Sequence, residues 1–97
     1  MSAIMEKRPD EVLDYVFDFG RWLSTGDAIS TATATATSAP VNGAAGTVAI
    51  DHVDFDSSTA TPWVTGGIDG ETAEIVVSIR TALGRRKSGV LRLRIRN

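Results

Sequence analysis

The segment 51–56, with the sequence Asp-His-Val-Asp-Phe-Asp, is where metal ligands could gather. On a strand, alternate positions share a face, so His52, Asp54 and Asp56 could together form a divalent-metal site. The spacing matches no established loop motif, because the glycine and the terminal glutamate of an EF-hand are missing. A solvated acidic strand face is therefore the favoured interpretation, and we expect no metal and no cofactor.

Groups for covalent or phosphate chemistry lack a suitable arrangement. Ser57, Ser58 and Thr59 lie close to His52 in the sequence but do not form a spaced set of nucleophile, base and orienting group. The chain has no cysteine, which excludes thiolate catalysis, disulfides and cysteine-based zinc sites. The glycine-rich run 66–70 leads into a predicted strand, so no helix N-terminus is available for a phosphate. We predict that the protein is not an enzyme.

Six basic residues near the end of the sequence are the main candidates for a partner interface. They are Arg85, Arg86, Lys87, Arg92, Arg94 and Arg96. The first three cap a predicted hairpin and the last three line one face of the final strand. They could dock an acidic protein partner or follow phosphates, or they could only block unwanted pairing of an edge strand. Nucleic acid is the least favoured partner, because no aromatic residue for base stacking follows Trp63.

Charge is distributed unevenly along the chain, although the net charge is only −2. Up to Glu74 there are twelve acidic and three basic residues, which gives −9, and from Ile75 onward there are seven basic residues and no acid, which gives +7. A chain polarised in this way can contact its own copies head to tail, or meet an acidic partner through its last strand.

The length of 97 residues corresponds to one domain with a single modest core. No apolar run approaches the roughly 18 residues of a membrane span, and no signal peptide is recognisable. We therefore expect no membrane partner and no export. Residues 1–8 are polar and lack periodicity, so they are predicted to be a flexible N-terminal arm, followed by the domain at residues 9–97.

The elements of the first half are predicted from the alternation of side chains. Residues 13–19 alternate aromatic or aliphatic side chains with mainly acidic ones, which indicates a half-buried strand. Residues 20–24 are predicted to form a short helical turn, and we expect both Trp22 and Trp63 in the core. Residues 29–37 alternate threonine with alanine, which favours a strand with a closely packed alanine face over a low-complexity linker.

The second half is predicted to hold four further strands. They cover residues 47–55, 61–65, 73–80 and 90–96. The first of them needs an irregularity to bring its apolar residues to one face, and Pro62 suggests that the second begins a strand or lies at an edge. Residues 38–46 and 83–89 are predicted loops. Six to seven short strands with regularly spaced turns predict an all-β, immunoglobulin-like β-sandwich.

Two long segments of the chain resemble the fiber-tail adaptor proteins of tailed bacteriophages. They are KRPDEVLDYVFDFGRWLSTGDAIST at residues 7–31 and TPWVTGGIDGETAEIVVSIRTALGRRKSGVLRLRIR at residues 61–96. The order and spacing of the proline-acid start, the Trp-Leu pair, the double-glycine turn, the aliphatic strand and the Gly-Arg loop carry the resemblance. The chain departs from the family pattern in two places. Residues 31–37 consist only of alternating threonine and alanine, and Ala73 stands where the family tends to carry an aromatic residue.

The resemblance implies an immunoglobulin-like virion protein without catalytic residues. Such a protein would lie in several copies around a tail or neck, joining the tail or connector to fibres, and would be in the host cytoplasm during assembly. A head-decoration or head-closure protein shares the same setting and fold. The remaining alternative is an immunoglobulin-like module that binds carbohydrate or a host surface, for which Trp22 and Trp63 are the available aromatic platforms.

Overall fold

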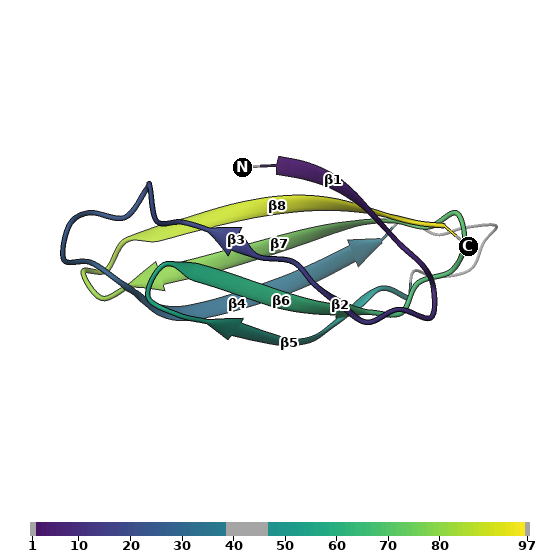
Figure 1. Ribbon diagram of the computed structural model, residues 1–97, viewed down its shortest axis with the longest axis horizontal. Helices are drawn as coiled ribbons and strands as arrows, with labels where there is room; N and C mark the ends of the chain where they lie inside the picture. The colour runs from purple at the N-terminus through teal and green to yellow at the C-terminus, as the bar shows by residue number, and fades with distance from the viewer. Residues whose placement is uncertain (1, 39–46, 97) are drawn as a thin grey trace.

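The protein is built from two β-sheets, as seen in a computed structural model that describes residues 2–38 and 47–96 (Figure 1). Its strands are β1 (Ser2–Lys7), β2 (Leu13–Asp14), β3 (Phe17–Asp18), β4 (Ile29–Ser38), β5 (Ala49–Phe55), β6 (Thr59–Thr65), β7 (Thr72–Thr81) and β8 (Arg86–Ile95). None of the described residues is helical, so the predicted all-β class is confirmed. The molecule is elongated, with extents of 48 × 20 × 19 Å.

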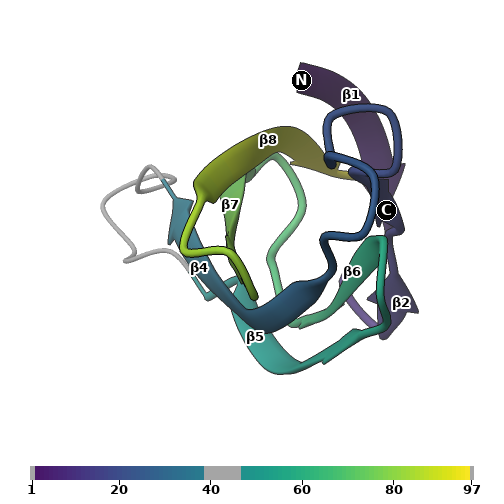
Figure 2. The same cartoon turned by 90° about the vertical axis from the view of Figure 1, so that its left-hand side faces the viewer.

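The strand orders of the two sheets decide which strands lie along the two sides, or flanks, of the molecule. Sheet A runs β1-β8-β7-β4, with β1 parallel to β8 and the other pairs antiparallel. In sheet B, β2 and β3 both pair with β6, and β5 also pairs with β6. Figure 2 shows β4 and β5 together on one flank, and β1 and β2 on the other.

The predicted strand at 13–19 is present but interrupted, and Pro62 is the reason. β2 and β3 pair with β6 in one continuous register, with Leu13 opposite Val64 and Phe17 opposite Ala60. Between them, the Tyr15 N–H donates to the Pro62 carbonyl at 3.2 Å. Proline has no N–H to return the bond, so the ladder breaks there. The expectation that Pro62 marks an edge or a strand start was wrong, because it is buried in the middle of the central strand of sheet B.

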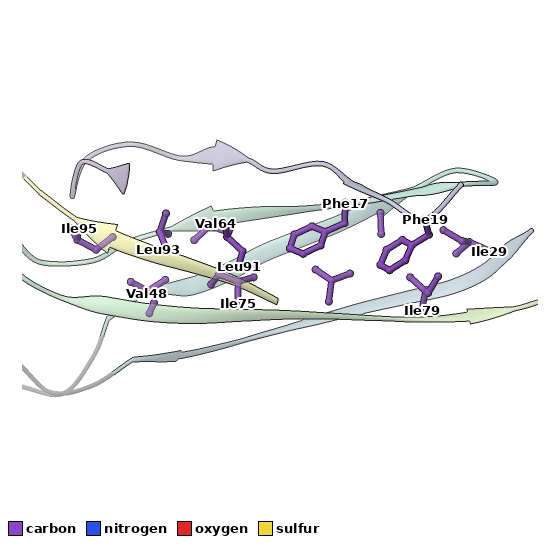
Figure 3. Close-up of a cluster of buried hydrophobic side chains, with 13 residues drawn as sticks. Phe17, Phe19, Ile29, Val48, Val64, Ile75, Ile79, Leu91, Leu93 and Ile95 are labelled. Atoms are coloured by element: carbon purple, nitrogen blue, oxygen red, sulfur yellow. The ribbon is translucent and has the colours of Figure 1, made fainter. Parts of the chain in front are cut away.

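The core lies between the sheets and is aliphatic except for two rings (Figure 3). Its buried members are Phe17, Phe19, Ile29, Val48, Ala60, Val64, Ala73, Ile75, Val77, Ile79, Leu91, Leu93 and Ile95. The alternation of β7 and β8 places every second side chain of these strands in it, as predicted. At roughly 25 cal/mol per Å² of buried apolar surface, such inward faces are the main source of stability in a domain of this size.

The alanine–threonine segment forms β4, and the alternative of a linker is excluded. Ala32, Ala34 and Ala36 are half-buried and pack against the core, whereas the intervening threonines are exposed. The predicted irregularity of the next strand is confirmed as a register shift between Ile50 and His52 in β5. Most of the predicted loop at 38–46 lies outside the described residues, which include only its first residue, Ser38, at the end of β4.

Two local predictions were wrong. The expected helical turn at residues 20–24 is not seen. There, Trp22 and Leu23 donate their N–H groups to the Phe19 carbonyl at 3.0 and 3.1 Å, and the chain then leaves the turn. A single turn restricts the backbone of several residues but forms few hydrogen bonds, so it does not extend into a helix. The predicted loop at 83–89 is also too long, because β8 begins at Arg86 and only residues 82–85 connect it to β7.

The first residues of the chain, which we expected to be a flexible arm, form β1, an edge strand of sheet A. β1 pairs in parallel with β8 from Ser2 opposite Val90 to Lys7 opposite Ile95. The Arg96 N–H extends this ladder by donating to the Lys7 carbonyl at 2.9 Å. The segment therefore has a defined place at the edge of sheet A. That residues 1–8 can leave the sheet as an arm, and that the strands are connected as in an immunoglobulin domain, stay predictions.

Candidate functional site

The six basic candidates lie in two separate groups along β8. Arg85, Arg86 and Lys87 lie at the start of the strand, and the other three lie at its end. Six residues of extended strand between Arg86 and Arg92 correspond to about 20 Å. The structure therefore provides two basic groups with different surroundings in place of one continuous patch.

The group at the end of β8 has acidic neighbours. Arg92 and Arg94 are exposed on the outer face of sheet A. Glu74 of β7 lies opposite Arg92 in the register, and Glu6 of β1 lies opposite Arg94. Opposite charges on neighbouring strands attract each other across the ladder. This face is consequently of mixed charge, and it differs from the uniformly basic stripe that the sequence suggested.

Two members of the group at the start of β8, Arg85 and Lys87, lie around Trp22, whereas Arg86 borders a different hollow together with Thr31, Thr33 and Arg80. The guanidinium of Arg85 lies 4.2 Å from the centre of the Trp22 ring, and the Lys87 ammonium lies 5.7 Å from it. Arg85 Nη1 also donates to Ser24 Oγ at 2.6 Å. Cations within about 6 Å of an indole face are attracted by the ring quadrupole. Trp22 is half-buried and packs against the core, so the expected core position is confirmed in part. Contrary to expectation, it also forms a surface platform for these cations.

A hollow opens beside this platform. It has a volume of about 430 Å³ and is lined by Asp18, Phe19, Arg21, Trp22, Lys87 and Ser88. We call it the Trp22 groove. The two aromatic rings supply its apolar part, and Arg21 and Lys87 supply exposed positive charges. Such a surface suits an occupant that is apolar at its centre and negative at its margin.

The predicted acidic segment lies on β5, at the opposite flank, and is organised by hydrogen bonds. The His52 ring stacks on Trp63 with centroids 5.3 Å apart, and His52 Nδ1 lies 2.7 Å from the Asp51 carboxylate. That hydrogen bond is the main cause that raises the pKa of His52 above its ordinary value. Trp63 donates its Nε1–H to Asp54 at 3.1 Å. Trp63 is thus a second half-buried surface tryptophan, again contrary to expectation.

The metal-site alternative for His52, Asp54 and Asp56 is not supported by this geometry. His52 Nε2 lies 3.5 Å from Asp54, but the Asp56 carboxylate accepts hydrogen bonds from the Ser58 and Thr59 N–H groups at 2.9 and 2.7 Å. Asp56 thereby holds the turn between β5 and β6. In residues 2–38 and 47–96, no three histidine, cysteine or acidic side chains come together in a way that could hold a metal ion.

A buried polar cluster at the other end of the molecule was missed by the sequence analysis. Glu71 is 0% exposed, and its carboxylate accepts the N–H groups of Thr47, Val48 and Ile68 at 3.0, 3.2 and 3.1 Å. Burial by itself raises the pKa of Glu71, but these bonds and one from the Ser38 side chain lower it below its ordinary value. The carboxylate therefore joins the glycine turn before β7 to the residues that enter β5.

Lys7 completes this cluster. Its side chain is 2% exposed, and Nζ donates to the carbonyls of Gly66 and Arg8 at 2.6 and 2.7 Å. Burial lowers the pKa of Lys7, and nearby carboxylates, including that of Glu71, oppose this shift. A sequence signal existed for Glu71 alone, because it continues the inward positions of β7. Lys7 lies opposite the inward Ile95, a position that only the pairing of β1 with β8 reveals.

Comparison with known proteins identifies the family of the chain. No helix among the described residues has the length and apolarity to cross a membrane. A search of curated proteins finds no match. A family model described as "Podophage GP4 fiber-tail adaptor protein gp77" matches residues 7–94, from the last residue of β1 almost to the end of β8. This match confirms the resemblance found in the sequence, and the chain belongs to the Gp77 family of podophage fiber-tail adaptor proteins.

Proposed function

We propose that this protein joins the tail or connector of a podophage particle to its fibres through protein–protein contacts. The observation that carries the proposal is the family match over residues 7–94, which includes strands of both sheets. A fiber-tail adaptor is a structural protein of the phage tail and binds other tail and fibre proteins. The finer assignment, to the neck or tail junction of the virion and to several copies around its axis, is part of the proposal.

The two basic groups on β8 are proposed to serve different contacts. Arg92, Arg94 and Arg96 lie at the end of the strand, on an exposed face with acidic neighbours. A mixed-charge surface of this kind specifies the orientation of a protein partner more than it adds affinity. Arg85 and Lys87 instead border an aromatic groove, which suits an apolar anchor. Nucleic acid is not proposed as a partner for either group.

The N-terminal segment supplies a further route of attachment. β1 pairs with β8 on one side only among the described residues, so its other edge presents unpaired backbone groups. A strand from another virion protein could pair there, or residues 1–8 could leave as an arm and pair with a neighbour. The division into an arm and a domain at 9–97, with an immunoglobulin-like sandwich as its fold, belongs to this proposal.

Particles assembled without this protein test the proposal. We expect a phage that carries a stop codon in its gene to form DNA-filled heads with tails but without attached fibres, and the protein supplied in trans to restore the fibres. Electron micrographs and the protein composition of purified particles measure both. Particles with a full set of fibres would contradict the proposal. Fibred particles with fragile heads would favour the head-decoration or head-closure alternative.

A second candidate function is favoured by one observation, which is the exposure of both tryptophans. A carbohydrate-binding module presents aromatic platforms, and Trp22 and Trp63 are both half-buried at the surface. Each ring already has a neighbour, Arg85 near Trp22 and His52 stacked on Trp63, which makes them less available to a sugar. Binding of the free protein to a glycan array, with loss of binding on replacing either tryptophan, would favour this module over the adaptor.

A further inference from the structure

The Trp22 groove lies where β8 has a strand partner on one side only among the residues that the structure describes. β7 pairs with β8 from Arg86 onward, but β1 begins its pairing at Val90. The first residues of β8 are therefore open on the flank of β1 and β3, and the turn that carries Trp22 lies beside them. The groove is thus a feature of one flank of the molecule.

The charges around the groove are predominantly positive. Arg21 and Lys87 are exposed at its margin, and Arg85 lies over the Trp22 ring. The one carboxylate among the lining residues belongs to Asp18, which accepts the Gly20 N–H at 2.8 Å. An occupant that brings carboxylates beside an apolar side chain would match the groove in both respects.

Such a segment exists on the opposite flank of the same protein. Phe55, the last residue of β5, is 45% exposed although it is a large aromatic residue. Its sequence neighbours Asp54 and Asp56 are both exposed, and Asp51 adds a further negative charge to the strand. β5 lies next to β4 and away from β1 (Figure 2), and it pairs with β6 on the side opposite to β3. The Phe55 segment, residues 54–56, is therefore complementary to the Trp22 groove.

We propose that Phe55 of one copy inserts into the Trp22 groove of a second copy, with its flanking aspartates facing Lys87 and Arg21. The contact joins two different surfaces on opposite flanks, so it is heterologous and can repeat from copy to copy. Repetition closes into a ring when the rotation between copies closes. The inference rests on the proposed function, because an adaptor around a tail axis is present in several copies.

Other exposed apolar side chains do not offer the same match. Val16 is 65% exposed and, like Phe55, has acidic neighbours, but its side chain is a small aliphatic one without a ring to place against the aromatic rings of the groove. Leu83 is exposed in the turn before β8, where the Asp27 carboxylate accepts its N–H at 3.2 Å and the basic Arg85 follows two residues later, so charges of both signs lie near it. Phe55 combines an exposed aromatic ring with negative neighbours, which fits it to the positive, aromatic groove.

Two variants and their mixture test the contact. We expect sedimentation velocity of the full chain over a concentration series to show association. Phe55→Ser or Lys87→Glu should each weaken it by roughly tenfold or more, since a central anchor or a facing charge is lost. In a mixture, Lys87→Glu still offers Phe55 and Phe55→Ser still offers an intact groove. The mixture should therefore form 1:1 heterodimers and nothing larger. Val16→Ser, also at an exposed apolar residue, is the matched control and should behave as the unaltered protein.

Zero-length cross-linking identifies the contact directly, because Lys87 is the one lysine besides the buried Lys7. A mixture of isotopically light and heavy chains should yield cross-links from Lys87 to Asp54 or Asp56 that join the two isotopes.

An unaltered protein that stays monomeric at every concentration would overturn the inference, as would association that persists in both variants. If the unaltered protein is monomeric and particles that carry either variant still lack fibres, the groove binds another virion protein and the inference is overturned. The proposed adaptor function is tested separately, by the fibres of particles that lack the chain.

Discussion

Replacing Glu71 by alanine is expected to lower the free energy of unfolding by about 3–5 kcal/mol, which is a large part of the stability of a small domain. The carboxylate is completely buried and accepts the N–H groups of Thr47, Val48 and Ile68. Alanine leaves these donors without their acceptor and removes the negative charge near the buried Lys7. Chemical denaturation followed by tryptophan fluorescence measures the loss.

The same carboxylate makes stability depend on pH. The pKa of Glu71 in the folded protein lies below the value of about 4.3 typical of an unfolded chain. The contribution of Glu71 to the free energy of unfolding is therefore fully present above a pH of about 4.3, and it is lost as pH falls through the pKa of the folded protein. Glu71→Gln, which keeps the shape and one oxygen, should lose stability at neutral pH and show a smaller further loss on acidification than the unaltered protein.

Glu74→Gln provides the matched control, because Glu74 is an exposed glutamate only three residues after Glu71, on β7. It should leave both the stability at neutral pH and its acid dependence nearly unchanged, within about 0.5 kcal/mol. A Glu71→Ala variant as stable as the control would show that the buried carboxylate does not hold the end of the two sheets together.

Replacing Gly89 by alanine is expected to cost about 1–3 kcal/mol, although alanine is ordinarily the better strand residue. A Cβ at this position of β8 would lie 2.7 Å from Cδ2 and 3.1 Å from Cε2 of Phe17. The Phe17 ring is itself buried among the other core side chains, so a shift of the ring would disturb their packing (Figure 3). The melting temperature should fall by several degrees in thermal unfolding, as is usual for a domain of this size.

A double-mutant cycle attributes this effect to the ring. Phe17→Val removes Cδ2 and Cε2, the two atoms that the new methyl group meets, so Gly89→Ala should cost less in that background than in the unaltered protein. Ser88→Ala, at the neighbouring exposed position of the same strand, should change stability by about 0.5 kcal/mol or less. Equal costs of Gly89→Ala in both backgrounds would exclude the contact with Phe17 as the cause.

Local alternation was sufficient to predict the long strands. β7 follows a period of two over its ten residues, β4 does so from Thr31 onward and β8 from Gly89 onward, and these parts place their small or aliphatic side chains inward as predicted. The polar exceptions to this rule were harder to recognise. Glu71 continues the inward row of β7, but a buried carboxylate is intelligible only once the donors from Thr47, Val48 and Ile68 are seen around it.

Features that depend on distant parts of the chain were not predictable. β1 has no clear alternation of its own and is placed by parallel pairing with β8, more than eighty residues later. The break at Tyr15 depends on Pro62, which lies opposite it in β6. Arg85 and Lys87 were recognised as candidates from their charge, but their position around Trp22 and the open edge of β8 follows only from the packing.

Whether this protein connects tail and fibres can be seen by electron microscopy of the intact particle with the density of this chain located. We expect density at the junction of tail and fibres, in contact with both, with the Phe55 segment of each copy against the Trp22 groove of the next. Density spread over the head, or absence of the chain from the particle, would contradict the proposed function.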